Sequence, residues 1–325
     1  MRCMVELSAE HDKLPLAELR AVLDISGGRI LTVDGAVVVV EAAEPAFLAR
    51  RLALAHSISE HWWSGPVDNV LDAARPIEGS LAVRVRRVEG AHPDVSSSAI
   101  ARGLGAALKG PVDLDTPEVD VRVLIAGQAH AGRLLVELDR KAFDARAVRH
   151  RAHVAPVSLH PRYARALVNL ARIRTGERVA DPFCGTGGLV IEAGLVGARV
   201  LASDLDARMV AGTRDTLLTM GVKEATVEPR DVGELPEFAG EKLDVVLSDP
   251  PYGKSSTTNR EAMDGLYERF LAAAHEALRP GGRLAVIFPS PTLRERAAGR
   301  FTLTEAYEQR VHRSMTRHYG IFTRG

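Results

Sequence analysis

The second half of the chain alternates short apolar segments with segments of helical length, and this alternation constrains the fold more than any other feature. Strands are predicted over 178–180, 199–203, 225–229, 243–248 and 283–288, and helices over 163–173, 189–194, 207–220 and 262–278. This order is typical of a doubly wound α/β fold with a mainly parallel sheet. Ligands of such sheets bind at the carboxyl ends of the strands, so the residues that follow the strands are the first candidates for a site.

The first half has a different pattern, in which strands outnumber helices. Strands are predicted over 2–7, 29–33, 36–41, 80–87, 119–125 and 133–138, and helices over 16–26, 45–55 and 97–108. Trp62 and Trp63 are expected to be packing anchors. A length of 325 residues suits two or three domains. We predict an α+β domain over 1–70, a second over 71–145, a basic linker over 146–161 and the α/β domain over 162–325.

The 42 basic and 42 acidic side chains give a formal net charge of zero. This balance excludes a polybasic tail protein and an acidic disordered chain. Residues 1–150 carry 18 basic and 21 acidic side chains, whereas residues 151–325 carry 24 and 21. Basic residues are concentrated over 149–178 and 294–325, which are either solvated surfaces or parts of a nucleic-acid interface.

Several protein classes do not fit the sequence. No apolar run approaches the roughly 20 residues that span a bilayer, and the first residues lack the apolar segment of a signal peptide. Cys3 and Cys184 are the two cysteines, which excludes a disulfide framework and a cysteine-rich zinc site. We therefore expect a cytoplasmic monomer that uses neither a membrane nor a metal.

A glycine turn follows the first predicted strand of the α/β half. It reads VADPFCGTGG over 179–188, and its candidate ligand residues are Asp181, Phe183, Gly185, Thr186 and Gly187. Glycine lacks a Cβ atom, so a ligand can approach the backbone closely. The spacing differs from the G-x-G-x-x-G dinucleotide motif, and no lysine follows for a nucleoside triphosphate. A nicotinamide site or a plain tight turn remains an alternative for the turn taken alone.

Carboxylates also follow the next two strands. Asp204, followed by Leu205, lies about 20 residues after the glycines, where an acidic side chain can accept both hydroxyl groups of a ribose. Asp231 and the backbone of Val232 follow the third strand, where an adenine amino group can be bound. Taken alone, Asp231 is better explained as a loop or cap residue.

The most informative motif is Asp249-Pro250-Pro251-Tyr252, which follows an apolar strand. Consecutive prolines stiffen the loop and have no N–H, so the Asp249 carboxylate and the Pro250 carbonyl can both face one small polar group. An exocyclic base amine offers two N–H bonds to such acceptors, which would hold it for attack on a methyl sulfonium. Tyr252 offers a flat surface on which a base can stack. A rigid structural turn is the alternative.

Together, the motifs DPFCGTGG, SDLD and SDPPYG in this order resemble class I S-adenosylmethionine-dependent amino-methyltransferases. The segments PRYARALVNL (161–170) and RVHRSMTR (310–317) resemble the archaeal tRNA guanine-10 N2-methyltransferase family. AVRVRR (82–87) and VDLDTP (112–117) resemble a THUMP domain, an RNA-binding module, which a ferredoxin-like unit precedes here. The resemblance covers nearly the whole chain and is most specific in the α/β half.

The resemblance implies a Rossmann-like class I methyltransferase domain behind N-terminal α+β ferredoxin-like and THUMP domains. Its cofactor would be S-adenosyl-L-methionine, with Asp181, Phe183, Gly185 and Gly187 at the methionine end, Asp204 at the ribose and Asp231 at the adenine. Asp249 to Tyr252 would hold the target guanine. One departure concerns residues 149–161, where the family suggests an Arg-Pro-Phe-Phe element and this chain reads RAHVAP over 151–156.

The implied reaction is methylation of the exocyclic N2 of a tRNA guanosine, at position 10, giving N2-methyl- and N2,N2-dimethylguanosine. The alternatives are another RNA guanine such as tRNA position 6, an adenine in DNA, or a catalytically silent RNA-binding protein. Basic side chains on both halves are expected to contact tRNA phosphates. They are Arg84, Arg86, Arg87, Arg310, His312, Arg313 and Arg317.

Overall fold

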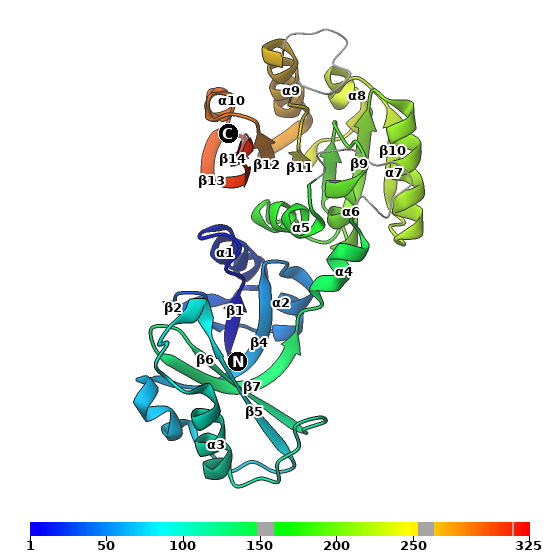
Figure 1. Cartoon of the computed structure of the whole chain (residues 1–325). Coiled ribbons are helices and arrows are strands. Elements are labelled where there is room, and N and C mark those ends of the chain that lie inside the picture. Colours follow the sequence, from blue (N-terminus) through cyan, green and yellow to red (C-terminus); the bar gives the residue numbers. More distant parts are fainter. Residues whose placement is uncertain (148–158, 253–262, 314) are drawn as a thin grey trace. The chain divides into compact units, whose positions relative to one another are not determined.

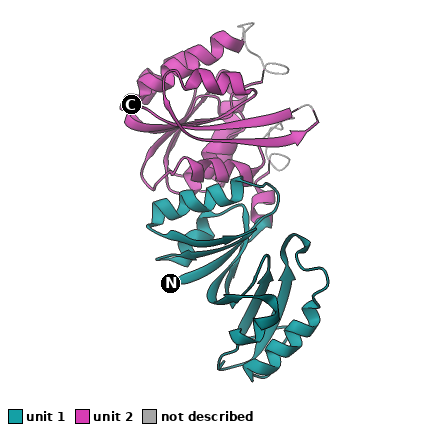
Figure 2. Ribbon diagram, turned by 90° about the vertical axis from the view of Figure 1, so that its left-hand side faces the viewer, with its two compact units in different colours: residues 1–140 teal, residues 141–325 magenta. Residues whose placement is uncertain are grey.

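The structure is a computed structural model that describes residues 1–147, 159–252, 263–313 and 315–325. The chain divides into two compact units, Met1–Arg140 and Lys141–Gly325 (Figure 2). Both units are built on a seven-stranded sheet with helices packed against it (Figure 1). Within the described residues, no helix combines the length and the apolar character needed to cross a membrane.

The first unit contains one mostly antiparallel sheet in the order β2-β3-β1-β4-β7-β6-β5. Its last pair, β5 and β6, is parallel. β4 pairs with β7, so the two predicted N-terminal domains share one continuous sheet. The elements are β1 (Arg2–Leu7), α1 (Leu14–Ser26), β2 (Arg29–Asp34), β3 (Val37–Glu41), α2 (Pro45–Arg51), β4 (Ala55–Gly65), β5 (Leu81–Arg87), α3 (Ser97–Leu108), β6 (Val119–Ile125) and β7 (Ala129–Glu137).

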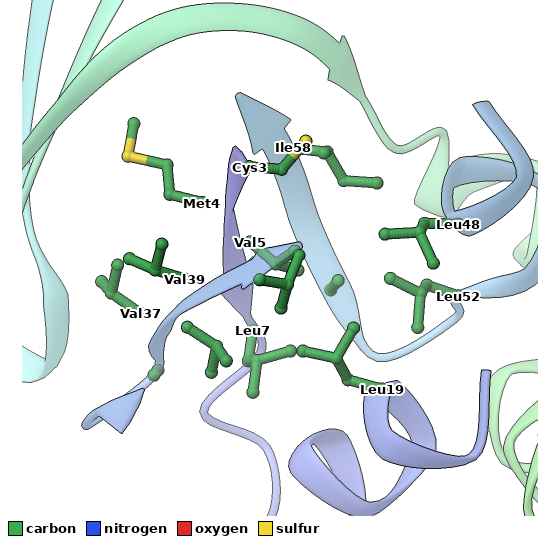
Figure 3. Close-up of a cluster of buried hydrophobic side chains, with 14 of the residues drawn as sticks. Cys3, Met4, Val5, Leu7, Leu19, Val37, Val39, Leu48, Leu52 and Ile58 are labelled. Atoms are coloured by element: carbon green, nitrogen blue, oxygen red, sulfur yellow. The ribbon is translucent and has the colours of Figure 1, made fainter. Parts of the chain in front are cut away.

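Two separate clusters of buried apolar side chains support this sheet. The first joins β1, β3 and β4 to α1 and α2, and Val5, Leu19 and Ile58 lie within it (Figure 3). The second lies under α3 and includes Leu104, with Trp62 and Trp63 packed against it. The tryptophans are therefore packing anchors, as expected. The division into domains at residue 70 remains a prediction, since residues from both sides of it contribute to each cluster.

The sequence prediction was wrong at the end of the second helix and in the strand that follows. α2 ends at Arg51 instead of continuing to residue 55, and β4 begins at Ala55. The reason is the fully buried Glu18 of α1, whose carboxylate accepts hydrogen bonds from the backbone N–H groups of Ala53 and Leu54 at 3.1 and 2.8 Å. These bonds hold the chain extended where local helix propensity would continue the helix.

The second unit contains a sheet in the order β10-β9-β8-β11-β12-β14-β13. The first five strands are parallel, and β14 runs antiparallel between β12 and β13. The chain enters at β8, moves outward to β10, and returns to β11 on the other side of β8. The strand order therefore reverses between β8 and β11, where doubly wound sheets bind their ligands.

The helices and strands of the second unit include all those predicted up to residue 288, with two short helices over 140–145 and 235–239 in addition. They are α4 (Arg140–Ala145), α5 (Pro161–Leu170), β8 (Arg178–Asp181), α6 (Gly188–Leu195), β9 (Arg199–Asp204), α7 (Ala207–Thr219), β10 (Ala225–Pro229), α8 (Leu235–Ala239), β11 (Leu243–Ser248), α9 (Met263–Ala277), β12 (Leu278–Phe288), α10 (Pro291–Ala297), β13 (Thr302–His312) and β14 (Met315–Thr323). The β13–β14 hairpin was missed by the sequence prediction, which treated 294–325 only as a basic segment.

Candidate active site

The carboxyl ends of β8 and β11 are joined by a buried hydrogen bond. Asp181 is the last residue of β8, and Ser248 is the last residue of β11. The Ser248 hydroxyl donates to Asp181 Oδ1 at 2.6 Å, and the Phe183 N–H donates to the same oxygen at 3.0 Å. The predicted cofactor residue Asp181 and the predicted catalytic residue Asp249 thus lie on neighbouring strand ends, at the reversal of strand order.

The glycine turn after β8 is held by its own backbone and by α7. Gly185 and Gly187 have φ angles of +48° and +81°, in the left-handed region that favours glycine. Thr213 of α7 donates its hydroxyl to the Gly185 carbonyl at 2.8 Å. A Cβ atom built on Gly185 would meet nothing within 4 Å, whereas one on Gly187 would meet Thr213. Gly185 therefore borders open space, while Gly187 is required for packing.

Phe183 and Thr186 complete the turn. Phe183 is partly buried, and its ring makes an edge contact with Phe270 of α9 at a centroid distance of 5.3 Å. Thr186 is also partly buried. The ring contact packs the turn against α9, beside Asp181.

Asp204 ends β9 and is tied to the glycine turn. Its carboxylate accepts the N–H of Gly185 and the N–H of Asp206, each at 3.0 Å. Each carboxylate oxygen can accept two hydrogen bonds, so Asp204 retains capacity for hydroxyl groups of a ligand. The adjacent Leu205 is 50% exposed, so an apolar surface lies beside the Asp204 carboxylate. This pairing suits a nucleoside, with its polar sugar and apolar base.

Asp231 and Val232 follow β10. The Asp231 carboxylate accepts the N–H of Gly233 at 2.8 Å and pairs with Arg269 of α9 at 2.5 Å. A reciprocal bond from its own N–H to Glu234 completes a capping box. The alternative view of Asp231 as a cap residue is confirmed, and its role toward adenine remains a prediction. Val232 is buried, 2% exposed, so its side chain belongs to the core.

The loop after β11 brings a tyrosine onto the Asp249 carboxylate. Tyr252 donates its hydroxyl to Asp249 Oδ1 at 2.5 Å, which closes the turn across Pro250 and Pro251. Tyr267 of α9 donates to the Pro251 carbonyl at 3.4 Å. Both prolines lack an N–H, so nothing in the turn itself competes for the Asp249 carboxylate except Tyr252. The loop is therefore stiff and presents a carboxylate at its start.

Three carboxylates share this edge, and the charges of two of them raise the pKa of the third. Burial raises the pKa of Asp181 to about 7, hydrogen bonds from Ser248 and Phe183 oppose that rise, and the nearby Asp204 and Asp249 charges add to it. Burial also raises the pKa of Asp204 and of Asp249. Like charges at one edge of a sheet are relieved by a cation. The arrangement therefore favours a positively charged ligand.

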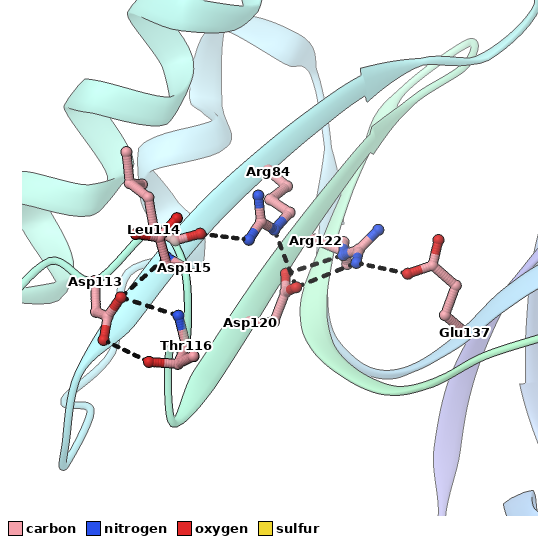
Figure 4. A network of polar contacts seen from close by, with 8 residues as sticks. All are labelled: Arg84, Asp113, Leu114, Asp115, Thr116, Asp120, Arg122 and Glu137. Atoms are coloured by element: carbon pink, nitrogen blue, oxygen red, sulfur yellow. Dashed lines mark hydrogen bonds and ion pairs between the residues drawn. The ribbon is translucent and has the colours of Figure 1, made fainter.

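In the first unit, the predicted RNA-binding arginines of β5 are exposed, but each has an intramolecular partner. Arg84 pairs with Asp120 at 3.1 Å and donates to the Leu114 carbonyl at 2.8 Å, in a network that includes Arg122 and Glu137 (Figure 4). Arg86 pairs with Glu6 at 2.8 Å, and Arg87 donates to the Pro93 carbonyl at 2.7 Å. Phosphate would compete with these partners.

In the second unit, three predicted RNA-binding residues lie at the tip of the β13–β14 hairpin. Arg310, His312 and Arg313 are exposed, and the Arg310 guanidinium donates to the carbonyls of His312 and Arg313 at 3.1 and 2.9 Å. Arg317 differs, because it is 4% exposed. Arg317 is buried because β14 is an inner strand of the sheet, and its contact with tRNA remains a prediction.

Sequence reasoning missed several residues that shape the site. Ser248 holds the Asp181 carboxylate, Thr213 the glycine turn and Tyr267 the Pro251 carbonyl, and of these three only Ser248 belongs to a motif. The departure noted at 151–156 lies outside the described residues. Within the described ranges, no group of three or more His, Cys, Asp or Glu side chains is arranged to hold a metal ion.

Comparison with known proteins agrees with this geometry. Residues 146–319 match the family model described as "RMKL-like, methyltransferase domain". A tRNA (guanine(10)-N2)-dimethyltransferase of Methanothermobacter thermautotrophicus is 38% identical over 98% of both chains. A tRNA (guanine(6)-N2)-methyltransferase of Thermus thermophilus is 38% identical over 67% of this chain and 65% of that one.

Among solved structures, TrmN from Thermus thermophilus covers 100% of both chains with a TM-score of 0.62 and 29% identity. The family model spans more than half of the chain, and the relative from Methanothermobacter thermautotrophicus matches it almost from end to end. The chain therefore belongs to the tRNA guanine-N2 methyltransferase family that has an RMKL-like methyltransferase domain.

Proposed function

We propose that this protein transfers a methyl group from S-adenosyl-L-methionine to the exocyclic N2 of guanosine 10 in tRNA, giving N2-methyl- and then N2,N2-dimethylguanosine. One observation carries the proposal: the Asp249-Pro250-Pro251-Tyr252 turn lies at the end of β11, beside Asp181 at the reversal of strand order. The Asp249 carboxylate, which would accept the guanine amine, thus lies beside the acidic strand ends that would bind the cofactor.

The residues at this edge fit the proposed cofactor. Open space at Gly185 admits a ligand against the backbone, and Asp204 with Leu205 suits a ribose and a base. The three carboxylates at this edge, two of which raise the pKa of Asp181, suit a ligand that carries an ammonium and a sulfonium charge. When bound, S-adenosylmethionine would supply an electrophilic methyl group.

The loop after β11 would supply the other half of the chemistry. Asp249 and the Pro250 carbonyl can each accept one hydrogen of the guanine amine, which positions the nitrogen and increases its electron density. A guanine must leave its stack to reach a loop of this kind, and Tyr252 offers a surface on which it can stack. An intact Asp249 and Tyr252 argue against a catalytically silent RNA-binding protein.

Methylation of guanine 6 is the second candidate, because the Thermus thermophilus relative named for that position is also 38% identical to this chain, over two thirds of it. Incubation of the purified protein with S-adenosylmethionine and a tRNA transcript, followed by nucleoside mass spectrometry, separates the two. We expect dimethylguanosine in the wild-type transcript and none when guanine 10 is replaced by adenine. Loss of product on replacing guanine 6 instead would overturn the assignment to position 10.

The exposed arginines at the hairpin tip lead to a binding prediction. Replacing Arg310 and Arg313 by Ala is expected to weaken tRNA binding and to reduce the slope of log K against log salt by about one per lost phosphate contact. Filter binding between 50 and 200 mM salt measures this slope. Arg199→Ala is the matched control, because Arg199 is exposed at the amino end of β9. An unchanged slope in the double variant would exclude the tip from the interface.

A further inference from the structure

Arg317 is a buried cation at the ligand-binding edge of the second unit. β14 runs antiparallel to β12, and His318 lies opposite Phe288, the last residue of β12. Arg317 therefore lies just beyond the carboxyl end of β12. Asp249, which follows the last residue of β11, lies at the same edge of the sheet. Although arginine is almost always exposed at its charged end, Arg317 is 4% exposed.

The neighbours of Arg317 come from three elements. Gln309 of β13 is its cross-strand partner, and Tyr319, two residues along β14, donates its hydroxyl to Gln309 at 2.8 Å. The Arg317 charge lowers the pKa of the Asp249 carboxyl, and Arg317 also lowers the pKa of the Tyr252 hydroxyl. Within the described part of the chain, its Nε atom is buried and has no hydrogen-bond partner.

A buried guanidinium is stable only when a counter-charge is close. The carboxylate in its environment is Asp249, which itself is partly buried and already holds Tyr252. Arg317, Tyr252 and Asp249 therefore form one group, in which the cation offsets the cost of burying the carboxylate. We propose that Arg317 is a positioning residue that keeps Asp249 ionised and holds Tyr252 against it, an inference that rests on the proposed function.

The ionised state of Asp249 matters for the proton balance. As the N2–CH3 bond forms, the S–CH3 bond breaks with its electron pair left on sulfur, and one N2 hydrogen leaves as a proton. A carboxylate can accept a hydrogen bond from the N–H group, receive that proton and pass it to water. A carboxylic acid already carries a proton and cannot receive another in this way. Protonation of Asp249 therefore removes activity.

The pH dependence follows from the groups around Asp249. Burial raises its pKa, and Arg317 and the Tyr252 hydroxyl lower it. The other ionisable side chains in its environment are Asp181 of β8, Tyr267 of α9 and Tyr319 of β14. Without Arg317 the carboxyl loses its one cationic neighbour among these groups, so its pKa rises further and the acid limb of the rate profile moves upward.

The test is the pH dependence of single-turnover methyl transfer to tRNA by wild-type protein, Arg317→Met and Arg317→Lys. We expect the acid limb of Arg317→Met to move up by about one pH unit or more, so that its rate falls about tenfold more at the acid end than at the plateau. Arg317→Lys, which keeps the charge, should return the limb toward the wild-type position.

Arg310→Met on the neighbouring strand is the matched control, expected to raise the KM for tRNA and leave the limb in place. An Arg317→Met profile that resembles this control overturns the inference and returns Arg317 to phosphate binding. If Arg317→Met does not fold, an unshifted limb in Arg317→Gln overturns it equally. A wild-type protein without activity on any tRNA would instead overturn the proposed function, so the two failures are distinguishable.

Discussion

Asp249→Asn is expected to lower single-turnover methyl transfer by at least about 100-fold while leaving tRNA binding intact. Asparagine has nearly the same shape and keeps one oxygen for the Tyr252 hydroxyl, so the turn should persist. Asparagine lacks the negative charge with which the carboxylate accepts the hydrogen bond from the guanine amine and takes up its proton. The effect should therefore fall on the chemical step and leave the binding of either substrate almost unchanged.

Transfer of a labelled methyl group to a tRNA transcript measures the rate, and a gel-shift titration measures binding. Asp244→Asn is the matched control, since Asp244 lies on the same strand at its other end, paired with Arg279 at 2.7 Å. That variant should transfer methyl groups at the wild-type rate. Wild-type activity in Asp249→Asn would show that the carboxylate is not the acceptor of the amine.

The fold could be predicted best where local patterns and the sheet agree. In the second unit, each predicted strand from β8 to β12 occurs near its expected place, and the apolar segments that predict β11 and the end of β12 are buried, as is usual for parallel strands. The β13–β14 hairpin was not recognised, because β13 is a polar edge strand and the inner strand β14 includes His318 and Gly320. The fold around Glu18 was missed because it depends on a contact 35 residues away.

The site could be predicted from residues that follow strands. Asp181, Asp204 and Asp249 all lie at strand ends on one edge of the sheet, since parallel strands place their carboxyl ends together. The side chains that hold the loops beside these residues could not be predicted, because Thr213 and Tyr267 come from helices without a motif. The burial of Arg317 was not predicted, since a basic segment gives no indication of which residue the sheet buries.

The buried Asp181 predicts an opposition between stability and cofactor binding. Its pKa is about 7 in the folded chain and 3.8 for an ordinary aspartate, so the folded state binds the proton more tightly. Unfolding free energy should therefore fall as the pH rises from about 4 to about 7 and become level above that. Asp181→Asn removes this penalty, because asparagine keeps the oxygen that accepts from Ser248 and Phe183. At pH 8 we expect the variant to be more stable by up to about 4 kcal/mol.

The same substitution should weaken S-adenosylmethionine binding, because it removes a negative charge from an edge that lies beside the open space at Gly185. In wild-type protein a cationic ligand competes with the proton on Asp181, so affinity should fall about tenfold per pH unit below pH 7 and be level above it. Calorimetry and urea unfolding between pH 5 and 8 measure both effects. Asp215→Asn, at an exposed carboxylate of α7, should change neither. A variant that binds the cofactor as tightly as wild type at pH 8 would show that Asp181 serves the fold alone.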